Sequence, residues 1–102
     1  MKSIPYPQVE APPPGCAIRL EVLGTPVAVF NVQGKFRAIE ARCPHRAGPL
    51  EKGQVESQTV TCPWHGSQFD LETGRVIRGP ATAGVRAYPV HLDGAILVIE
   101  AP

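Results

Sequence analysis

Two short motifs in the sequence each place a thiol close to an imidazole. Cys43 and His45 flank a single proline, and Cys62 and His65 flank a Pro-Trp pair. The whole chain has only three cysteines and three histidines, so chance does not readily explain two such pairs. Thiolate and neutral imidazole groups are metal ligands, so these four side chains predict a metal site built from two loops.

The spacing of the four residues does not identify the metal by itself. Two Cys and two His also suit a tetrahedral zinc site. The surrounding residues favour iron and sulfide. They read Cys43-Pro44-His45-Arg46-Ala47-Gly48 and Cys62-Pro63-Trp64-His65-Gly66-Ser67-Gln68-Phe69-Asp70. This pattern resembles the Rieske iron–sulfur family, whose signature is Cys-x-His followed, at about this distance, by Cys-x-x-His-Gly. The resemblance extends from about Val27 to Ile99.

The resemblance implies one [2Fe–2S] cluster per chain. Cys43 and Cys62 would bind one iron, and His45 and His65 would bind the other. With two thiolates and two neutral imidazoles the oxidised core is neutral, whereas four thiolates would make it a dianion. A neutral core accepts an electron more easily, and potentials of Rieske centres span about −150 to +300 mV.

Residues next to the ligands bear on that potential. Gly48 and Gly66 follow the ligand histidines and are expected to let backbone N–H groups approach the sulfurs, although an ordinary turn role is equally open. Ser67 offers a hydroxyl donor, whereas Phe69 stands where high-potential members from cytochrome bc-type complexes carry a donating tyrosine. Those members also carry two extra cysteines, at positions held here by Gly48 and Trp64. We therefore expect a potential in the lower part of the family range.

Three further features surround the two motifs. The segment Gly79-Pro80-Ala81 resembles a proline loop that covers the cluster in this family, or it is a plain turn. Five residues are expected to form an apolar collar, in which Trp64 either packs locally or docks a redox partner: Pro44, Leu50, Pro63, Trp64 and Pro80. Arg42 and Arg46 are either solvated charges or groups that favour the reduced cluster and recognise an acidic partner.

The rest of the chain predicts an all-β fold that holds these loops. Strand-like segments recur at 16–23, 26–32, 35–41, 55–61, 67–71, 75–78, 85–92 and 95–100. Gln33-Gly34, Thr73-Gly74 and Asp93-Gly94 predict tight turns. Residues 1–14 contain five prolines and predict an extended arm. We expect one domain over residues 1–102, a Rieske-like antiparallel β-sandwich with a small cluster-binding subdomain at about 42–81.

Two residues of ligand type stand apart from the motifs. Cys16 precedes a strand and is expected to be a small buried apolar side chain. His91 lies in a strand without a neighbouring Cys or carboxylate motif, and is expected at the surface or satisfied in the core. Neither is assigned to the metal.

Composition excludes several functional classes. Ten basic and nine acidic residues give a net charge of +1 without runs of one sign, which argues against nucleic-acid binding. The longest aliphatic run has about five residues, whereas a membrane helix needs about 20. Three cysteines and the lack of an apolar leader pattern predict a reducing compartment, the cytoplasm.

The number of histidines limits the chemistry. Rieske oxygenases activate O₂ at a second iron held by two histidines and a carboxylate, but only one histidine remains here once His45 and His65 are used. The resemblance therefore implies a Rieske-type ferredoxin, not an enzyme, that carries one electron from a flavin-dependent reductase to an oxygenase or similar terminal enzyme. Two alternatives stay open: a small Rieske subunit of a nitrite-reductase-type enzyme, and a zinc-stabilised binding module without a redox role.

Overall fold

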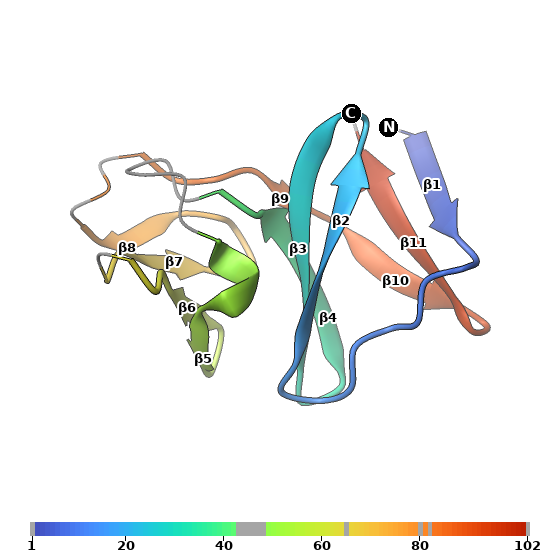
Figure 1. The fold of residues 1–102 in the computed structure, drawn as a ribbon, viewed down its shortest axis with the longest axis horizontal. Helices are drawn as coiled ribbons and strands as arrows, with labels where there is room; N and C mark the ends of the chain where they lie inside the picture. The colour runs from blue at the N-terminus through green and yellow to red at the C-terminus, as the bar shows by residue number, and fades with distance from the viewer. Residues whose placement is uncertain (1, 43–48, 65, 80, 82, 102) are drawn as a thin grey trace.

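Three antiparallel sheets form the molecule, as seen in a computed structural model that describes residues 2–42, 49–64, 66–79, 81 and 83–101 (Figure 1). The outer sheet has the order β1-β11-β10, the central sheet β2-β3-β4-β9, and the loop sheet β5-β6-β7-β8. The strands are β1 (Lys2–Tyr6), β2 (Ala17–Val22), β3 (Thr25–Val32), β4 (Lys35–Glu40), β5 (Gln54–Glu56), β6 (Thr59–Thr61), β7 (Gln68–Asp70), β8 (Val76–Arg78), β9 (Ala87–Tyr88), β10 (Val90–Asp93) and β11 (Ile96–Ala101), and one 3₁₀ turn, η1, spans Leu50–Lys52.

Strand β3 lies between two hydrophobic cores and packs one face against each. Successive side chains of a strand point to opposite faces. Val27 and Val29 accordingly pack with Leu97 and Ile99 of the outer sheet. Phe30 points the other way and packs with buried residues of the loop sheet, including Phe69. Since both faces are covered, the apolar run from Val27 to Phe30 is buried throughout.

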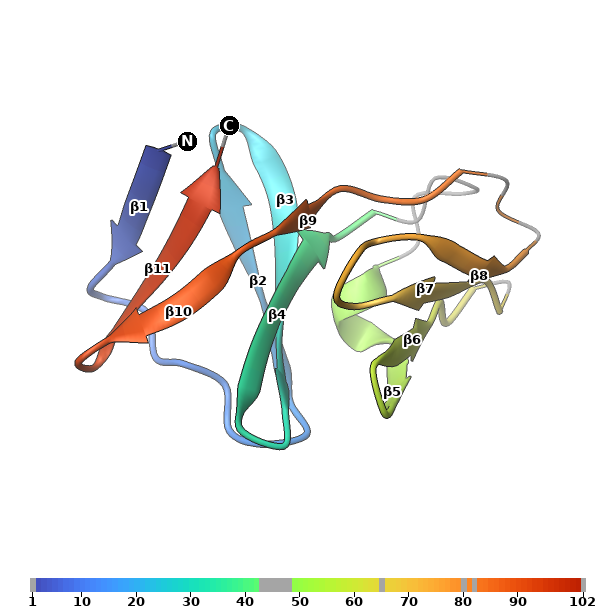
Figure 2. The same cartoon turned by 180° about the vertical axis from the view of Figure 1, so that it is seen from behind.

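The loop sheet is an insertion between two paired strands. β4 pairs antiparallel with β9, although about 46 residues separate Glu40 from Ala87. The Glu40 N–H donates to the Arg86 carbonyl at 2.9 Å, and the Arg86 N–H donates to the Glu40 carboxylate at 2.8 Å. The chain therefore leaves the central sheet and returns to it at one place, while β5 to β8 form a separate lobe (Figure 2).

The N-terminal arm is extended, as predicted, but part of it belongs to a sheet. Its first residues form β1, which pairs with β11 over five residue pairs. Pro5 is tolerated there because β1 is an edge strand and its missing N–H breaks no central ladder. The later part of the arm is held by Asn31, whose buried side-chain amide donates to the Pro12 carbonyl at 2.9 Å.

Two predicted strands are each divided in the structure. The segment 55–61 is a hairpin, because Ser57 adopts a positive φ of 54° between β5 and β6. The segment 85–92 breaks at Pro89 into β9 and β10, which belong to different sheets. A proline cannot donate a ladder hydrogen bond, so this break is where the chain changes sheets.

Three two-residue turns between strands contain a glycine, of which one is shifted from its predicted place and one was not predicted. The tight turn predicted at Thr73-Gly74 is part of a longer connection, residues 71–75 between β7 and β8, in which Gly74 has a positive φ of 79°. Gln33 and Gly34 both have positive φ, as a type I′ turn requires. The β10–β11 turn is Gly94-Ala95 instead of Asp93-Gly94, since Asp93 still pairs with Ile96. The β2–β3 turn at Leu23-Gly24, also with two positive φ angles, was not predicted.

The predicted fold class is confirmed: the chain is an all-β antiparallel sandwich with a smaller loop-bearing sheet. Within the part of the chain that the structure describes, no helix is long and apolar enough to cross a bilayer.

Candidate metal centre

The first predicted ligand loop is closed at its base. Arg42 and Pro49 form an antiparallel bridge, and the Leu50 N–H donates to the Ala41 carbonyl at 2.8 Å. Ala41 and Leu50 are both fully buried. The predicted ligands Cys43 and His45 lie between these anchors in the sequence, outside the described residues. Their loop therefore begins and ends at adjacent backbone positions on a buried support.

The second loop turns back on itself between β6 and β7. The Cys62 N–H donates to the Ser67 carbonyl at 2.7 Å, and the Gly66 N–H donates to the Cys62 carbonyl at 3.1 Å. Gly66 has a φ of +78°, which side chains with a Cβ rarely adopt, so glycine is required for this closure. His65 lies outside the described residues.

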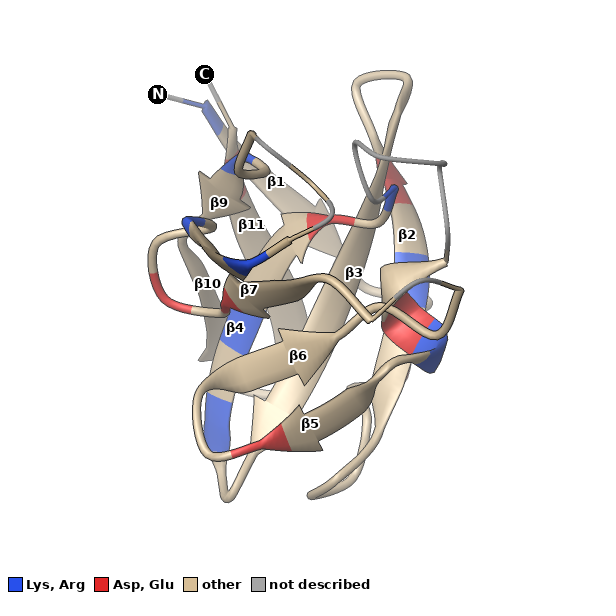
Figure 3. Cartoon of the chain, turned by 90° about the vertical axis from the view of Figure 1, so that its left-hand side faces the viewer, with Lys and Arg blue, Asp and Glu red and all other residues tan. Residues whose placement is uncertain are grey.

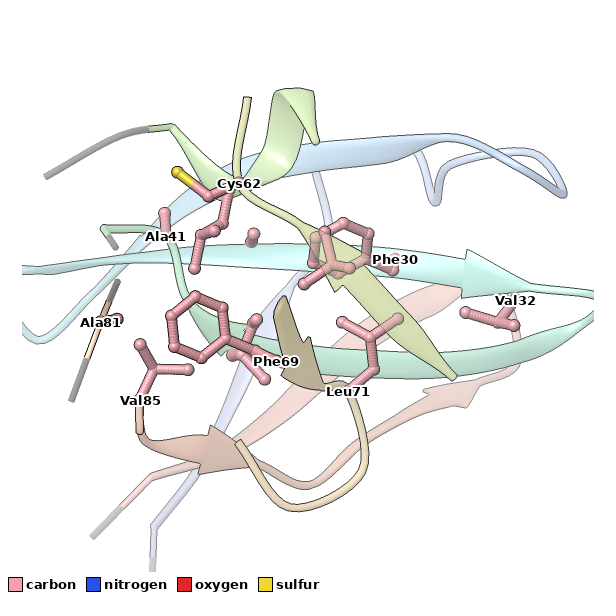
Figure 4. Packing of buried hydrophobic residues seen from close by; sticks show 12 residues of the cluster. Phe30, Val32, Ala41, Cys62, Phe69, Leu71, Ala81 and Val85 are labelled. Atoms are coloured by element: carbon pink, nitrogen blue, oxygen red, sulfur yellow. The ribbon is translucent and has the colours of Figure 1, made fainter. Parts of the chain in front are cut away.

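Cys62 stands at the edge of the core that supports both loops. It is 3% exposed and belongs to the same buried group as Ala41, Leu50 and Phe69. Its sulfur points away from the rings of Phe30 and Phe69, with Ala41 beside it (Figure 4). The first loop leaves this core from Ala41, and the second leaves it from Cys62, so the two loops start from one buried floor.

Ser67 connects the second loop to a third segment. The Ser67 side chain is fully buried, and its hydroxyl oxygen accepts a hydrogen bond from the Ala81 N–H at 3.0 Å. Ala81 is the last residue of the segment predicted to resemble the proline loop, so that segment is attached directly to the second ligand loop. A hydroxyl that accepts one bond still has a proton to donate. Its donation toward a sulfur stays a prediction.

The collar prediction is partly wrong. Leu50 is fully buried beneath the first loop, because η1 turns its side chain into the core, and it contributes nothing to the surface. Pro63 is exposed, and Trp64 is 56% exposed, which contradicts tight local packing of its ring. Pro44 and Pro80 lie outside the described residues, as do Arg46 and Gly48. Phe69 is a fully buried core residue.

Cys16 is exposed, which corrects the prediction that it is buried. It lies in the bend before β2, where its N–H donates to the Pro13 carbonyl at 3.0 Å and its carbonyl accepts from the Asn31 N–H at 3.1 Å. These backbone bonds hold the bend without covering the side chain. His91 lies exposed on β10, one of the two places predicted for it.

The donor set fits a centre that bridges two loops. Each loop supplies one Cys and one His, and both loops start from the same buried floor. Among the described residues alone no group of three metal-ligating side chains occurs, since only Cys62 of the four candidates is described. The connection missed by sequence reasoning is the bond between Ser67 and Ala81. In the sequence, Ser67 directly after His65-Gly66 indicates a possible hydrogen bond, but it does not identify the partner, because the partner is the backbone N–H of Ala81.

Known proteins resemble this chain in sequence and in structure. A family model for the Rieske [2Fe–2S] domain matches residues 4–89. The 3-phenylpropionate/cinnamic acid dioxygenase ferredoxin subunit of Escherichia coli strain K12 is 40% identical over 91 residues, covering 88% of this chain and 85% of that protein.

Two solved structures share the fold over nearly the whole chain. The ferredoxin of carbazole 1,9a-dioxygenase from Nocardioides aromaticivorans IC177 superposes with a TM-score of 0.87 at 27% identity, covering 96% of this chain and 98% of that one. A chain in a complex of reduced oxygenase and oxidised ferredoxin of carbazole 1,9a-dioxygenase has a TM-score of 0.83 at 27% identity, covering 94% of this chain and 92% of that one.

The two closed loops, their shared floor and the family match over residues 4–89 agree, and this chain belongs to the Rieske [2Fe–2S] family.

Proposed function

We propose that this chain is a one-electron carrier, a Rieske-type ferredoxin that takes an electron from a flavin-dependent reductase and passes it to an oxygenase or similar terminal enzyme. The observation that carries the proposal is the pair of closed loops rising from one buried floor, each with one Cys and one His. The relatives described as dioxygenase ferredoxin subunits support the role.

Four residues would hold the cluster: Cys43, His45, Cys62 and His65. When bound, the [2Fe–2S] cluster accepts and releases one electron. The chain's own contribution is to fix the two loops. The Arg42–Pro49 bridge holds the first, and the bond from the Cys62 N–H to the Ser67 carbonyl holds the second.

Exposure at this end of the molecule suits transfer of an electron between proteins. Pro63 and Trp64 lie between two of the proposed ligands and are exposed, so the second loop faces solvent. A partner can therefore approach the centre closely without any change in the buried floor. No catalytic step is assigned to the chain, since the remaining histidine, His91, lies on β10 of the outer sheet.

Single substitutions of the four proposed ligands test the assignment. We expect Cys43→Ala, His45→Ala, Cys62→Ala and His65→Ala each to lose iron, labile sulfide and the electron paramagnetic resonance signal of the dithionite-reduced protein. Cys16→Ala and His91→Ala are matched controls, because they remove the third cysteine and the third histidine and should leave all three measurements unchanged. Retention of iron and labile sulfide by any of the ligand variants would refute the assignment, and so would their loss in either control.

The alternatives predict different results for the same preparation. A zinc-stabilised module would hold one zinc without labile sulfide and would be colourless. A nitrite-reductase-type subunit would contain the cluster but would exchange electrons with that enzyme instead of an oxygenase. Anaerobic stopped-flow mixing of the reduced protein with each type of acceptor separates the two carriers.

Two further parts of the proposal concern the whole chain. Residues 1–102 form one domain, an assignment supported by the pairing of β1 with β11 across nearly the full length of the sequence. The location is the cytoplasm, which suits cysteine ligands and an exposed Cys16 thiol, since thiols stay reduced there. Limited proteolysis tests the first statement, and fractionation of the native cells tests the second.

A further inference from the structure

Basic residues are concentrated around the two ligand loops and the segment attached to them. The stretches 41–50, 62–69 and 76–85 contain three arginines, Arg42, Arg46 and Arg78, and no Asp or Glu. The chain as a whole has ten basic and nine acidic residues, so seven basic and nine acidic residues remain elsewhere. The three stretches therefore carry a formal charge of about +3, with Glu40, Glu51 and Asp70 directly at their borders, and the remainder of the chain is slightly negative.

Two of these arginines are placed by the backbone next to the loops. Arg42 forms the bridge with Pro49 at the base of the first loop. Arg78 pairs with Gln68 at the start of β7, directly after the second loop, and Gln68 pairs in turn with Thr61. One arginine thus borders each loop.

Both arginine side chains are exposed, and neither forms an ion pair with a described residue. The single ion pair among the described residues joins Arg19 to Glu51 at 3.5 Å, and it involves neither Arg42 nor Arg78. Glu21 lines the same surface hollow as Arg42 but forms no ion pair with it in the described structure. Figure 3 looks onto this end, where the acidic end of β5 lies at the lower edge of the loop sheet.

An exposed aromatic ring lies among these charges in the sequence. Trp64 is the only tryptophan of the chain, and more than half of its surface is accessible. Large exposed apolar side chains bordered by polar groups are typical of interaction sites, and tryptophan and arginine are over-represented among residues that dominate binding energy. We call Arg42, Trp64 and Arg78 the arginine face.

We infer that the arginine face docks an acidic protein surface, one that presents carboxylates around an apolar site for Trp64. The inference rests on the proposed electron-transfer function and adds the chemistry of the partner. Positive charge beside the exposed loop steers a negative partner toward the centre, and such steering acts mainly on the association rate. The site at which the partner protein exchanges the electron is accordingly surrounded by Asp and Glu.

Small redox ions of opposite charge test the sign of this surface in the cluster-loaded protein. One electron passes from the reduced protein to hexacyanoferrate(III), giving hexacyanoferrate(II), or to hexaammineruthenium(III), giving hexaammineruthenium(II). Stopped-flow rates with the two oxidants are compared as a ratio, so any change in the driving force of a variant largely cancels. The variants are Arg42→Ala and Arg78→Ala. The control is Lys2→Ala, a loss of one charge on β1 at the other side of the molecule (Figure 1).

The expected effects follow from screened Coulomb interactions. For a trivalent ion about 10 Å from the lost charge, the anion reacts about fivefold more slowly and the cation about fivefold faster at about 0.01 M salt. Near 0.15 M salt both changes fall to about twofold. Lys2→Ala should change either rate by less than about 1.5-fold, because the molecule is 38 Å long. Arg42→Lys and Arg78→Lys keep the charge and should restore the original ratio.

Binding to a carboxylate surface provides a readout that needs no electron transfer. The protein should adsorb to a carboxylate-terminated monolayer on a quartz-crystal microbalance, and Arg42→Ala and Arg78→Ala should weaken adsorption more than Lys2→Ala. A ratio of the two rates that is the same in Arg42→Ala, Arg78→Ala and the parent protein, or equal adsorption of all variants, would overturn the inference. A protein without reversible one-electron chemistry would instead contradict the proposed function, while the adsorption measurement would still decide the sign of the surface.

Discussion

Replacing Ser67 by alanine tests whether the bond between the second loop and the third segment holds the site together. The Ser67 oxygen accepts from the Ala81 N–H at 3.0 Å, and Ser67 and Ala81 are 0% and 6% exposed. Ser67→Ala leaves that N–H buried without its partner, which costs roughly 1–3 kcal/mol. If the loss is local, exchange of the Ala81 amide hydrogen should accelerate roughly 5- to 150-fold.

Residue-resolved hydrogen–deuterium exchange of the cluster-loaded protein is the assay. The Val85 amide, which donates to the Gly74 carbonyl at 2.8 Å, serves as the internal reference and should keep its rate. Thr73→Ala is the matched variant, since the exposed Thr73 hydroxyl also accepts a backbone N–H, from Arg75 at 3.2 Å. We expect that variant to change stability by less than about 1 kcal/mol, because water replaces the lost partner. An Ala81 amide that exchanges equally fast with and without the Ser67 hydroxyl would refute the reasoning.

Three other predictions concern packing, pH and fluorescence. Gly74 and Gly24 share nearly the same φ, +79° and +83°, but only at Gly74 would a Cβ overlap a backbone oxygen, that of Val85. Gly74→Ala should therefore lower the free energy of unfolding in urea by roughly 1–3 kcal/mol more than Gly24→Ala. Equal losses in the two variants would contradict the close approach of Gly74 to the Val85 backbone. Burial raises the pKa of Tyr6 above its ordinary value of 10.0, so the folded state retains the phenol proton more tightly, and its stabilising effect is present below that value and is lost as pH rises above it. Tyr6→Phe should therefore show a smaller loss of urea stability between about pH 8 and about pH 11 than the parent protein, and an unchanged loss would count against this origin. Because Trp64 is exposed, acrylamide should quench its fluorescence. The fluorescence should decrease further when iron and sulfide are added, because Trp64 lies between two proposed ligands in the sequence. Equal emission before and after this addition would argue against Cys62 and His65 as ligands.

Local patterns predicted most of the strands because each is short and bounded by a turn residue. Gln33-Gly34 and the run Val27 to Phe30 are read directly from the sequence, since φ > 0 and burial on both faces impose strong residue preferences. The pairing of β1 with β11 was missed because it depends on residues at opposite ends of the chain. Ser57 was missed because a serine at positive φ carries little local signal.

The candidate ligands were predictable from residue type and spacing, whereas their support was not. Leu50 looked like a surface residue near the loops, and only η1 turns it into the core. Cys16 looked like a buried small side chain, but the bend before β2 leaves it in solvent. The hydrogen bond from the Ala81 N–H to the Ser67 hydroxyl joins segments 14 residues apart. Its donor is a backbone group that nearly every residue type carries, so residue type does not predict the bond.

The adjacent ends of the insertion between β4 and β9 make the loop-bearing lobe a replaceable module. The chain leaves the central sheet at Glu40 and re-enters it at Arg86, and these two residues are hydrogen-bonded to each other. A lobe of different length or surface charge can therefore be grafted there without lengthening any strand of the sandwich. The graft must keep apolar side chains that pack against Phe30, since Phe30 belongs to the buried cluster shared by the sandwich and the lobe. Partner preference can thus diversify on one scaffold while the sandwich stays constant.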